Sequence, residues 1–248
     1  QAAPLKHFLA YEEGFKTNFV LINSKNANAL TGRKGIEDIN TLFSKLNFDL
    51  INPVMSSTGV IGNRLPIEKL VTGALKFDLT AKSGENLSRA IMTTDAYPKT
   101  CLYEVKLEDG SSFKIGAVAK GAGMINPNLA TMLCFICTDA DVPYKDIKEA
   151  LNKNKETTFN AISVDGDTST NDTVMVLANG KSNAYNKDAF CEALRLVMHD
   201  MAMLMVADGE GAKKVAAFEV KNAATKEDAI KGLEILDQAI TVLDKYTN

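Results

Sequence analysis

Short apolar runs alternate along the chain with segments whose apolar residues recur every three or four positions. Residues 19–22 form an apolar run that ends in the polar loop 23–32, which is typical of a buried strand followed by a turn. Residues 34–46 have helical apolar spacing. Residues 54–62 begin as a strand and break into a Ser/Thr/Gly-rich loop, and Pro66 stands where a further helix would begin.

The second half of the chain continues this alternation. Residues 102–118 predict two strands joined by the turn EDGS at 108–111, and residues 132–137 (MLCFIC) predict a strongly apolar strand. Helices are expected to begin at Pro143 and at Lys187. The fold class is therefore expected to be α/β (α+β), with sheets and helices packed in layers.

Composition and charge narrow the classes of function. The chain has 248 residues, 46% of them hydrophobic, and a net charge of −3. No basic stripe is present, so neither nucleic acid nor an anionic membrane is expected as a partner. No apolar run reaches the roughly 20 residues of a membrane span, and no leader pattern precedes the first strand. With free cysteines, these features predict a cytoplasmic protein.

The cysteines do not form a metal-binding pattern. Cys134 and Cys137 are separated by two residues, but they lie in a predicted buried strand, which favours core cysteines. A zinc site would require a second pair or nearby histidines, and His7 and His199 are far away in the sequence. We therefore expect no metal.

Glycine-rich segments do not match nucleotide-binding motifs. Residues 116–123 (GAVAKGAG) lack the lysine and hydroxyl residue of a P-loop at the required positions. Residues 59–62 lack the third glycine of a dinucleotide fingerprint, and residues 208–211 are too short for either motif. The polar run 165–172 lacks the glycine and glutamate of an EF-hand loop, so a hydrogen-bonded loop is expected there.

Two other loops suggest acyl-transfer chemistry. The turn SSTG at 56–59 offers backbone N–H groups that can form an oxyanion hole, although a loop of this kind, taken alone, is more often an ordinary turn. Thr131 follows a glycine-containing loop and the small residue Ala130 at the start of an apolar strand. A hydroxyl there can attack the preceding carbonyl, and the amine released by cleavage can act as a base. An ordinary threonine at the start of a strand remains the alternative.

The chain resembles the ornithine acetyltransferase family, the bifunctional glutamate N-acetyltransferases of arginine biosynthesis. Residues 120–133 (KGAGMINPNLATML), continuing to 138–140, are similar to the cleavage-site signature of that family. Further segments match in the same order along the chain: 25–32 (KNANALTG), 57–62 (STGVIG) with 65–66, 91–95 (IMTTD) with 98–99, 164–172 (VDGDTSTND) and 208–212 (DGEGA).

The resemblance implies a self-processing enzyme cut between Ala130 and Thr131, with residues 1–130 as the alpha-chain portion and 131–248 as the beta-chain portion. Thr131 is then the nucleophile, and the donors of Thr58 and Gly59 form the oxyanion hole. Substrate-contacting positions fall on Thr93, Lys120 and Glu210. Their alternative interpretations are a loop threonine, a surface lysine and a solvated loop acid.

The implied reaction moves an acetyl group from N-acetylornithine to glutamate by a ping-pong mechanism through an acetyl-threonine. The implied fold is the family's layered α/β sandwich, convergent with N-terminal nucleophile hydrolases. No cofactor is expected, acetyl-CoA is a possible second donor, and the implied assembly is an α2β2 heterotetramer. Alternatives are a related self-processing aminopeptidase or amidohydrolase, and an inactive truncated paralogue.

Both ends of the chain differ from the family pattern. The sequence begins at Gln1, and members of the family extend beyond both of its ends. Thr225 and Asp228 have capping-box-like spacing, which predicts a helix in the tail. Residues 232–248 have no recognised counterpart. The expectation is either a piece of a longer protein or a shortened member whose site is partly open.

Overall fold

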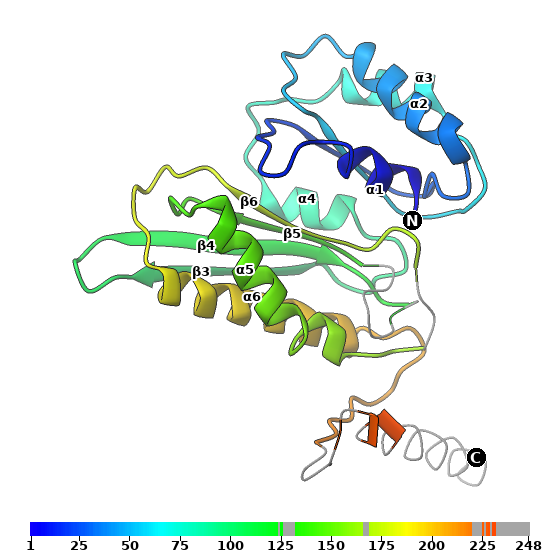
Figure 1. Cartoon of the computed structure of the whole chain (residues 1–248). Helices are drawn as coiled ribbons and strands as arrows, with labels where there is room; N and C mark the ends of the chain where they lie inside the picture. Colours follow the sequence, from blue (N-terminus) through cyan, green and yellow to red (C-terminus); the bar gives the residue numbers. More distant parts are fainter. Residues whose placement is uncertain are drawn as a thin grey trace, which may run out of the picture. The chain divides into compact units, whose positions relative to one another are not determined.

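The computed structural model describes residues 1–123, 125, 132–165, 169–219, 225, 227–228 and 230–231. The chain divides into two units, residues 1–212 and residues 213–248 (Figure 1). The strands and all of the candidate site residues belong to the first unit.

The N-terminal part of the first unit pairs two parallel strands with helices. Strand β1 (Val20–Asn23) lies beside β2 (Val54–Ser57), and helix α2 (Gly32–Ser44) connects them. Helices α1 (Ala3–Phe8) and α3 (Ile67–Ala74) flank this pair, with Pro66 capping α3 as expected. The predicted strands at 19–22 and 54–62 and the helix at 34–46 are thus confirmed within a few residues.

The larger sheet contains strands β3 (Lys99–Lys106), β4 (Ser112–Lys120), β5 (Leu133–Thr138) and β6 (Thr173–Ala178), in that order. The hairpin β3–β4 is antiparallel, as its turn sequence predicted. Strand β5 is antiparallel to β4 and parallel to β6, with Leu133 opposite Thr173. Helix α5 (Tyr144–Lys155) and the short 3₁₀ turn Phe159–Ala161 make the crossover from β5 to β6.

Strand β5 contributes side chains to two cores, one on each face of the sheet. Successive side chains of a strand point in opposite directions, so alternate residues reach different cores. Cys134 and Ile136 pack into the core formed with α5 and the long helix α6 (Lys187–Ala207), which lie together against this sheet in Figure 1. Leu133 and Phe135 pack instead into a cluster with Val54 of β2.

Alternation along β1 and β2 completes the layers. Val54 packs toward β5, whereas Leu21 and Met55 pack into the core with Ile39 and Leu42 of α2. The order of layers is therefore helix, sheet, sheet, helix, which confirms the expected layered α/β sandwich. Helix α4 (Gly84–Ala90) leads into β3 and contacts both β3 and β4.

The second unit is described only in part. Thr225 Oγ1 accepts a hydrogen bond from the Asp228 N–H at 3.1 Å, so the expected capping interaction is present. Residues 232–248, over which the helix predicted in this tail would continue, lie outside the described residues. Within the described part of the chain, no helix combines the length and the apolar character needed to cross a bilayer.

Candidate functional site

The turn after β2 holds Thr58 and Gly59 in a constrained backbone. Thr58 is buried, with 3% of its surface exposed, and its N–H donates to the Asn23 carbonyl at 3.0 Å. Gly59 has a φ of +131°, and a Cβ at this position would lie 2.2 Å from the carbonyl carbon of Lys25. Because that atom is main chain, it has no rotamer by which to move aside, and only glycine fits here.

The donors that this turn presents differ from the expectation in one respect. The Thr58 N–H is not available to a ligand, because the parallel pairing of β1 and β2 continues one residue past Ser57 and gives it to Asn23. Among the described residues, no hydrogen bond occupies the Thr58 hydroxyl or the Gly59 N–H. The turn therefore offers one O–H and one N–H donor, and their role as an oxyanion hole stays a prediction.

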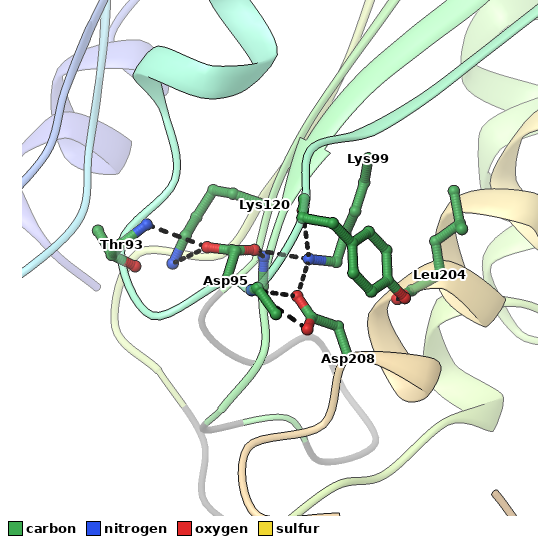
Figure 2. A network of polar contacts seen from close by, with 9 residues as sticks. Thr93, Asp95, Lys99, Lys120, Leu204 and Asp208 are labelled. Atoms are coloured by element: carbon green, nitrogen blue, oxygen red, sulfur yellow. Dashed lines mark hydrogen bonds and ion pairs between the residues drawn. The ribbon is translucent and has the colours of Figure 1, made fainter.

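A buried carboxylate, Asp95, connects two of the predicted substrate-contacting residues (Figure 2). Its Oδ2 atom accepts the Thr93 N–H at 3.1 Å and lies 3.9 Å from Lys120 Nζ. Its Oδ1 atom accepts the Lys99 Nζ at 2.8 Å and the Gly121 N–H at 2.7 Å. Burial alone would raise the pKa of Asp95, but these donors outweigh burial and hold the pKa below its usual value. Asp95 is therefore ionised near neutral pH.

Lys99 joins this cluster to the end of α6. Its side chain is fully buried, and its Nζ lies 2.5 Å from Asp208 Oδ2 as well as 2.8 Å from Asp95 Oδ1. Asp208 also accepts the Ala96 N–H at 3.0 Å. The two carboxylates, Lys99 and Lys120 balance in charge, which is the condition under which ionised groups are tolerated inside a protein.

Lys120 ends β4 with a side chain that is 4% exposed, so the alternative of a surface lysine is wrong. Burial lowers the pKa of Lys120, and the charge of Asp95 opposes that effect. The 3.9 Å separation from Asp95 is longer than a hydrogen bond. Among the residues that the structure describes, no acceptor lies within hydrogen-bond distance of Lys120 Nζ, so its ammonium group can bind an anionic group of a ligand.

Glu210 lies beside the loop that follows Lys120. Its N–H donates to the Ala122 carbonyl at 2.6 Å, and its Oε2 would be 2.8 Å from a Cβ at Gly123. The missing side chain of Gly123 thus makes room for this carboxylate. The side chain of Glu210 is exposed, as is Thr93, so an ordinary loop residue remains a valid alternative for each of these two. Thr93 and Lys120 both lie against Asp95, and Glu210 binds the main chain two residues after Lys120, at Ala122.

Asp172 lies at the entrance to β6, opposite the start of β5. Its Oδ1 atom accepts the Met132 N–H at 2.8 Å, whereas its Oδ2 atom is buried and accepts no hydrogen bond in the described part of the chain. Burial raises the pKa of Asp172 to about 7, and the Met132 N–H and the charge of Lys120 reduce the rise. A carboxyl group that titrates near neutral pH is thus adjacent in space to the residue after Thr131.

The predicted cleavage site itself, Ala130 and Thr131, lies outside the described residues, and so do residues 166–168 of the polar run. The roles of these residues and the division into 1–130 and 131–248 remain predictions. The described neighbours of the polar run agree with a hydrogen-bonded loop, since Asp165 Oδ1 accepts the Ile125 N–H at 2.9 Å. No cluster of histidine, cysteine, aspartate or glutamate suited to a metal ion occurs among the residues that the structure describes.

The expectation for the cysteines is correct only in part. Cys134 is buried in the core, but Cys137 is exposed. Residues three apart in a strand point to opposite faces, so one expected core position lies on the surface. The same geometry prevents the two sulfur atoms of β5 from binding one metal ion.

Comparison with known proteins assigns the family. The family model described as the ArgJ family matches residues 1–238. The chain belongs to the ArgJ family. This ArgJ-family match extends into residues 232–238, for which no counterpart was expected, so that expectation is wrong for these positions.

Similar ArgJ-family proteins occur in bacteria and archaea. The arginine biosynthesis bifunctional protein ArgJ of Wolinella succinogenes is 56% identical over 97% of this chain and 62% of its own length. The glutamate N-acetyltransferase of Methanothermobacter thermautotrophicus is 42% identical over 85% of this chain and 54% of its own length. The crystal structure of ArgJ from Bacillus halodurans matches with 34% identity and a TM-score of 0.45, covering 54% of this chain and 71% of that one. The chain thus spans between half and two thirds of the curated relatives it matches.

Three acidic residues of this ArgJ-family site were not predicted from the sequence. Asp95, Asp172 and Asp208 all fall within segments that were matched to the family, at 91–95, 164–172 and 208–212. Their roles depend on contacts between distant segments, such as the bond of Asp208 to Lys99. These residues could have been identified as candidates because each is an acidic residue inside a glycine- or threonine-rich segment that matches the family.

Proposed function

We propose that this protein transfers an acetyl group from N-acetylornithine to glutamate, with Thr131 as the nucleophile. The observation that carries the proposal is that Thr93 and Lys120 both lie against Asp95, while Glu210 is bound to the loop that directly follows Lys120. An amino-acid substrate carries a carboxylate and an ammonium group. Lys120 supplies a cation for the first and Glu210 an anion for the second. The names of the relatives from Wolinella succinogenes and Methanothermobacter thermautotrophicus support this choice of chemistry.

The proposed maturation step is an intramolecular acyl shift. The Thr131 hydroxyl attacks the carbonyl carbon of Ala130, the C–N bond between the two residues breaks, and the nitrogen becomes the free amine of Thr131. Water then hydrolyses the resulting ester, releasing the Ala130 carboxylate and restoring the hydroxyl. The product is a threonine that carries its own base, since an α-amine has a pKa of roughly 8.

In the proposed transfer, the Thr131 amine takes the hydroxyl proton while Oγ1 attacks the acetyl carbonyl of N-acetylornithine. The oxygen that becomes negative is stabilised by the Thr58 hydroxyl and the Gly59 N–H. The amide C–N bond breaks, the ornithine nitrogen receives the proton, and the acetyl group remains on Thr131. The amine of glutamate attacks this ester in the second half-reaction, which regenerates the hydroxyl of Thr131.

A single labelling experiment tests the proposal. Purified protein is incubated with N-acetylornithine alone, and the peptide that begins at Thr131 is analysed by mass spectrometry. We expect this peptide to gain one acetyl group, and to lose it when glutamate is added, with formation of N-acetylglutamate. Continuous release of acetate without glutamate would favour the aminopeptidase-like or amidohydrolase alternative. Absence of any acetylated peptide in the wild-type protein would refute the proposal and favour an inactive paralogue.

The remaining parts of the proposal concern donors and assembly. No cofactor is required by the chemistry above, and acetyl-CoA is a candidate second donor because the same acyl-threonine would form from a thioester. The proposed location is the cytoplasm, and the proposed assembly is α2β2, built from the two products of cleavage. Native mass spectrometry tests the assembly, and replacing N-acetylornithine with acetyl-CoA in the labelling experiment tests the second donor.

A further inference from the structure

Asn171, the residue before Asp172, contacts the loops that form the Gly59 turn. Its side chain is buried, with 5% of the residue exposed. Its Nδ2 atom donates to the Ser57 carbonyl at 2.9 Å and to the Ala27 carbonyl at 2.6 Å. A primary amide has two N–H bonds, so these contacts use its whole capacity as a donor.

One of these carbonyls directly precedes the turn, and the other belongs to a residue that binds the chain just after it. Ser57 directly precedes Thr58, and the Ala27 N–H donates to the Val60 carbonyl at 3.0 Å, just after Gly59. Asn171 therefore fixes the chain before the turn directly and the chain after it through Ala27. Removal of this amide would leave two buried carbonyl groups without this donor, and an aspartate here would place a carboxylate against them.

Asp172 holds the other side of the candidate site. It accepts the Met132 N–H at 2.8 Å, and the following residue, Thr173, donates its N–H to the Met132 carbonyl at 3.0 Å. Both polar groups of the Met132 main chain are therefore bound by the entrance of β6. Lys120 is the charged side chain that acts on Asp172, and it comes from β4, on the other side of β5. Met132 directly follows Thr131 in the sequence.

We propose that Asn171 and Asp172 are positioning residues that together set the Thr58–Gly59 turn against the start of β5. Asn171 contacts the turn and the adjacent Asp172 contacts Met132, so the spacing between these two elements depends on two consecutive residues at the start of β6. The kinetic consequence rests on the proposed function, because an oxyanion donor helps catalysis only when it is held at a fixed distance from the nucleophile.

The kinetic test compares Asn171→Ala with Asn154→Ala. Asn154 is also buried, at 3%, and its Nδ2 donates to the Cys191 carbonyl at 2.9 Å in the core between α5 and α6. Both variants lose a buried amide, but only the first adjoins the turn. For Asn171→Ala we expect kcat to fall about 100-fold with KM nearly unchanged, because the loss affects the transition state. A fall in kcat no larger than that of Asn154→Ala, with both proteins folded at the assay temperature, would overturn the proposal.

Amide hydrogen exchange tests the same proposal without any need for activity. Asn171→Ala should accelerate exchange of the Thr58 amide, and Asp172→Ala should accelerate exchange of the Met132 amide. Asp172→Asn keeps an acceptor oxygen and should preserve the protection of Met132. Unchanged exchange at both amides in the alanine variants would refute the positioning role, even in an active enzyme. If the wild-type protein transfers no acetyl group, the proposed function fails, and the exchange data alone decide the positioning role.

Discussion

Replacement of Asp172 by asparagine should change how the stability of the fold depends on pH. Burial raises the pKa of Asp172 to about 7, whereas an aspartate in an unfolded chain titrates near 3.9. The folded state thus holds this proton more tightly than the unfolded state. The stability that comes from the neutral form is complete below about pH 4 and is lost as the pH rises through about 7.

The magnitude follows from the separation of the two pKa values. Each pH unit between them removes about 1.4 kcal/mol from the free energy of unfolding, which gives roughly 4 kcal/mol in total. The side chain is only half-buried, and solvent screening reduces the expected loss to roughly 2–4 kcal/mol. Asp172→Asn has no proton to lose, so it should lack this decline while keeping an acceptor for the Met132 N–H.

The assay is urea unfolding between about pH 4 and pH 8, performed in a Thr131→Ala background so that a single uncut chain unfolds. The difference in stability between the Asp172→Asn variant and its parent should grow with pH in favour of the variant. Asp146→Asn is the matched control, because hydrogen bonds from Tyr185 and Lys187 lower the pKa of Asp146 and reverse the sign of the effect. A constant difference between Asp172→Asn and its parent across the pH range would refute the reasoning.

Three further predictions concern the nucleophile, the turn and the ionic cluster. Thr131→Ala should abolish both chain cleavage and acetyl transfer, whereas Thr131→Ser should retain some of each, as measured by intact mass and product formation. Gly59→Ala should lower the free energy of unfolding, measured by thermal unfolding, by at least about 2 kcal/mol, because the new Cβ would overlap main-chain atoms at a positive φ. Gly73→Ala, in an open helical position, should instead raise this free energy by about 0.5–1 kcal/mol. Lys99→Met should lower the free energy of unfolding by about 3–5 kcal/mol, because it removes the cation that two buried carboxylates share. Lys187→Met, on the surface, should change the unfolding midpoint little, and equal effects of the two substitutions would contradict the assigned role of Lys99.

The hydrophobic pattern was sufficient to predict much of the fold. The helices at α2, α5 and α6 and the β3–β4 hairpin follow directly from the spacing of apolar residues and from their turn sequences. Strand β6 (Thr173–Ala178) was not predicted, because the segment interpreted there, the polar run 165–172, ends just before it. The order of the layers depends on which face of β5 meets which core, and this requires contacts between distant segments.

The residues of the site could be predicted from the sequence, but their hydrogen-bond and ion-pair partners could not. The segments that hold Thr58, Lys120 and Glu210 could be identified from their resemblance to family motifs. The partners that hold these residues in place could not, because Lys99 binds Asp208 as well as Asp95 only after the end of α6 packs against β3. The loss of the Thr58 N–H to Asn23 was equally hidden, since it depends on the register of β1 against β2.

The antiparallel pairing of β4 with β5 affects how the protein would unfold and refold after it is cut. The proposed cut lies between these two strands, yet their ladder joins Lys120 to Leu133 and continues to Ile115 and Thr138. Cleavage would therefore leave two polypeptides that share one sheet. They could separate only if the hydrogen bonds between β4 and β5 were broken. Refolding would change from a unimolecular search into an encounter between two partners, and would slow with dilution. Such a protein would fold efficiently only before it is cut. After cleavage, its stability would be kinetic, because it would depend on slow unfolding and not on ready refolding.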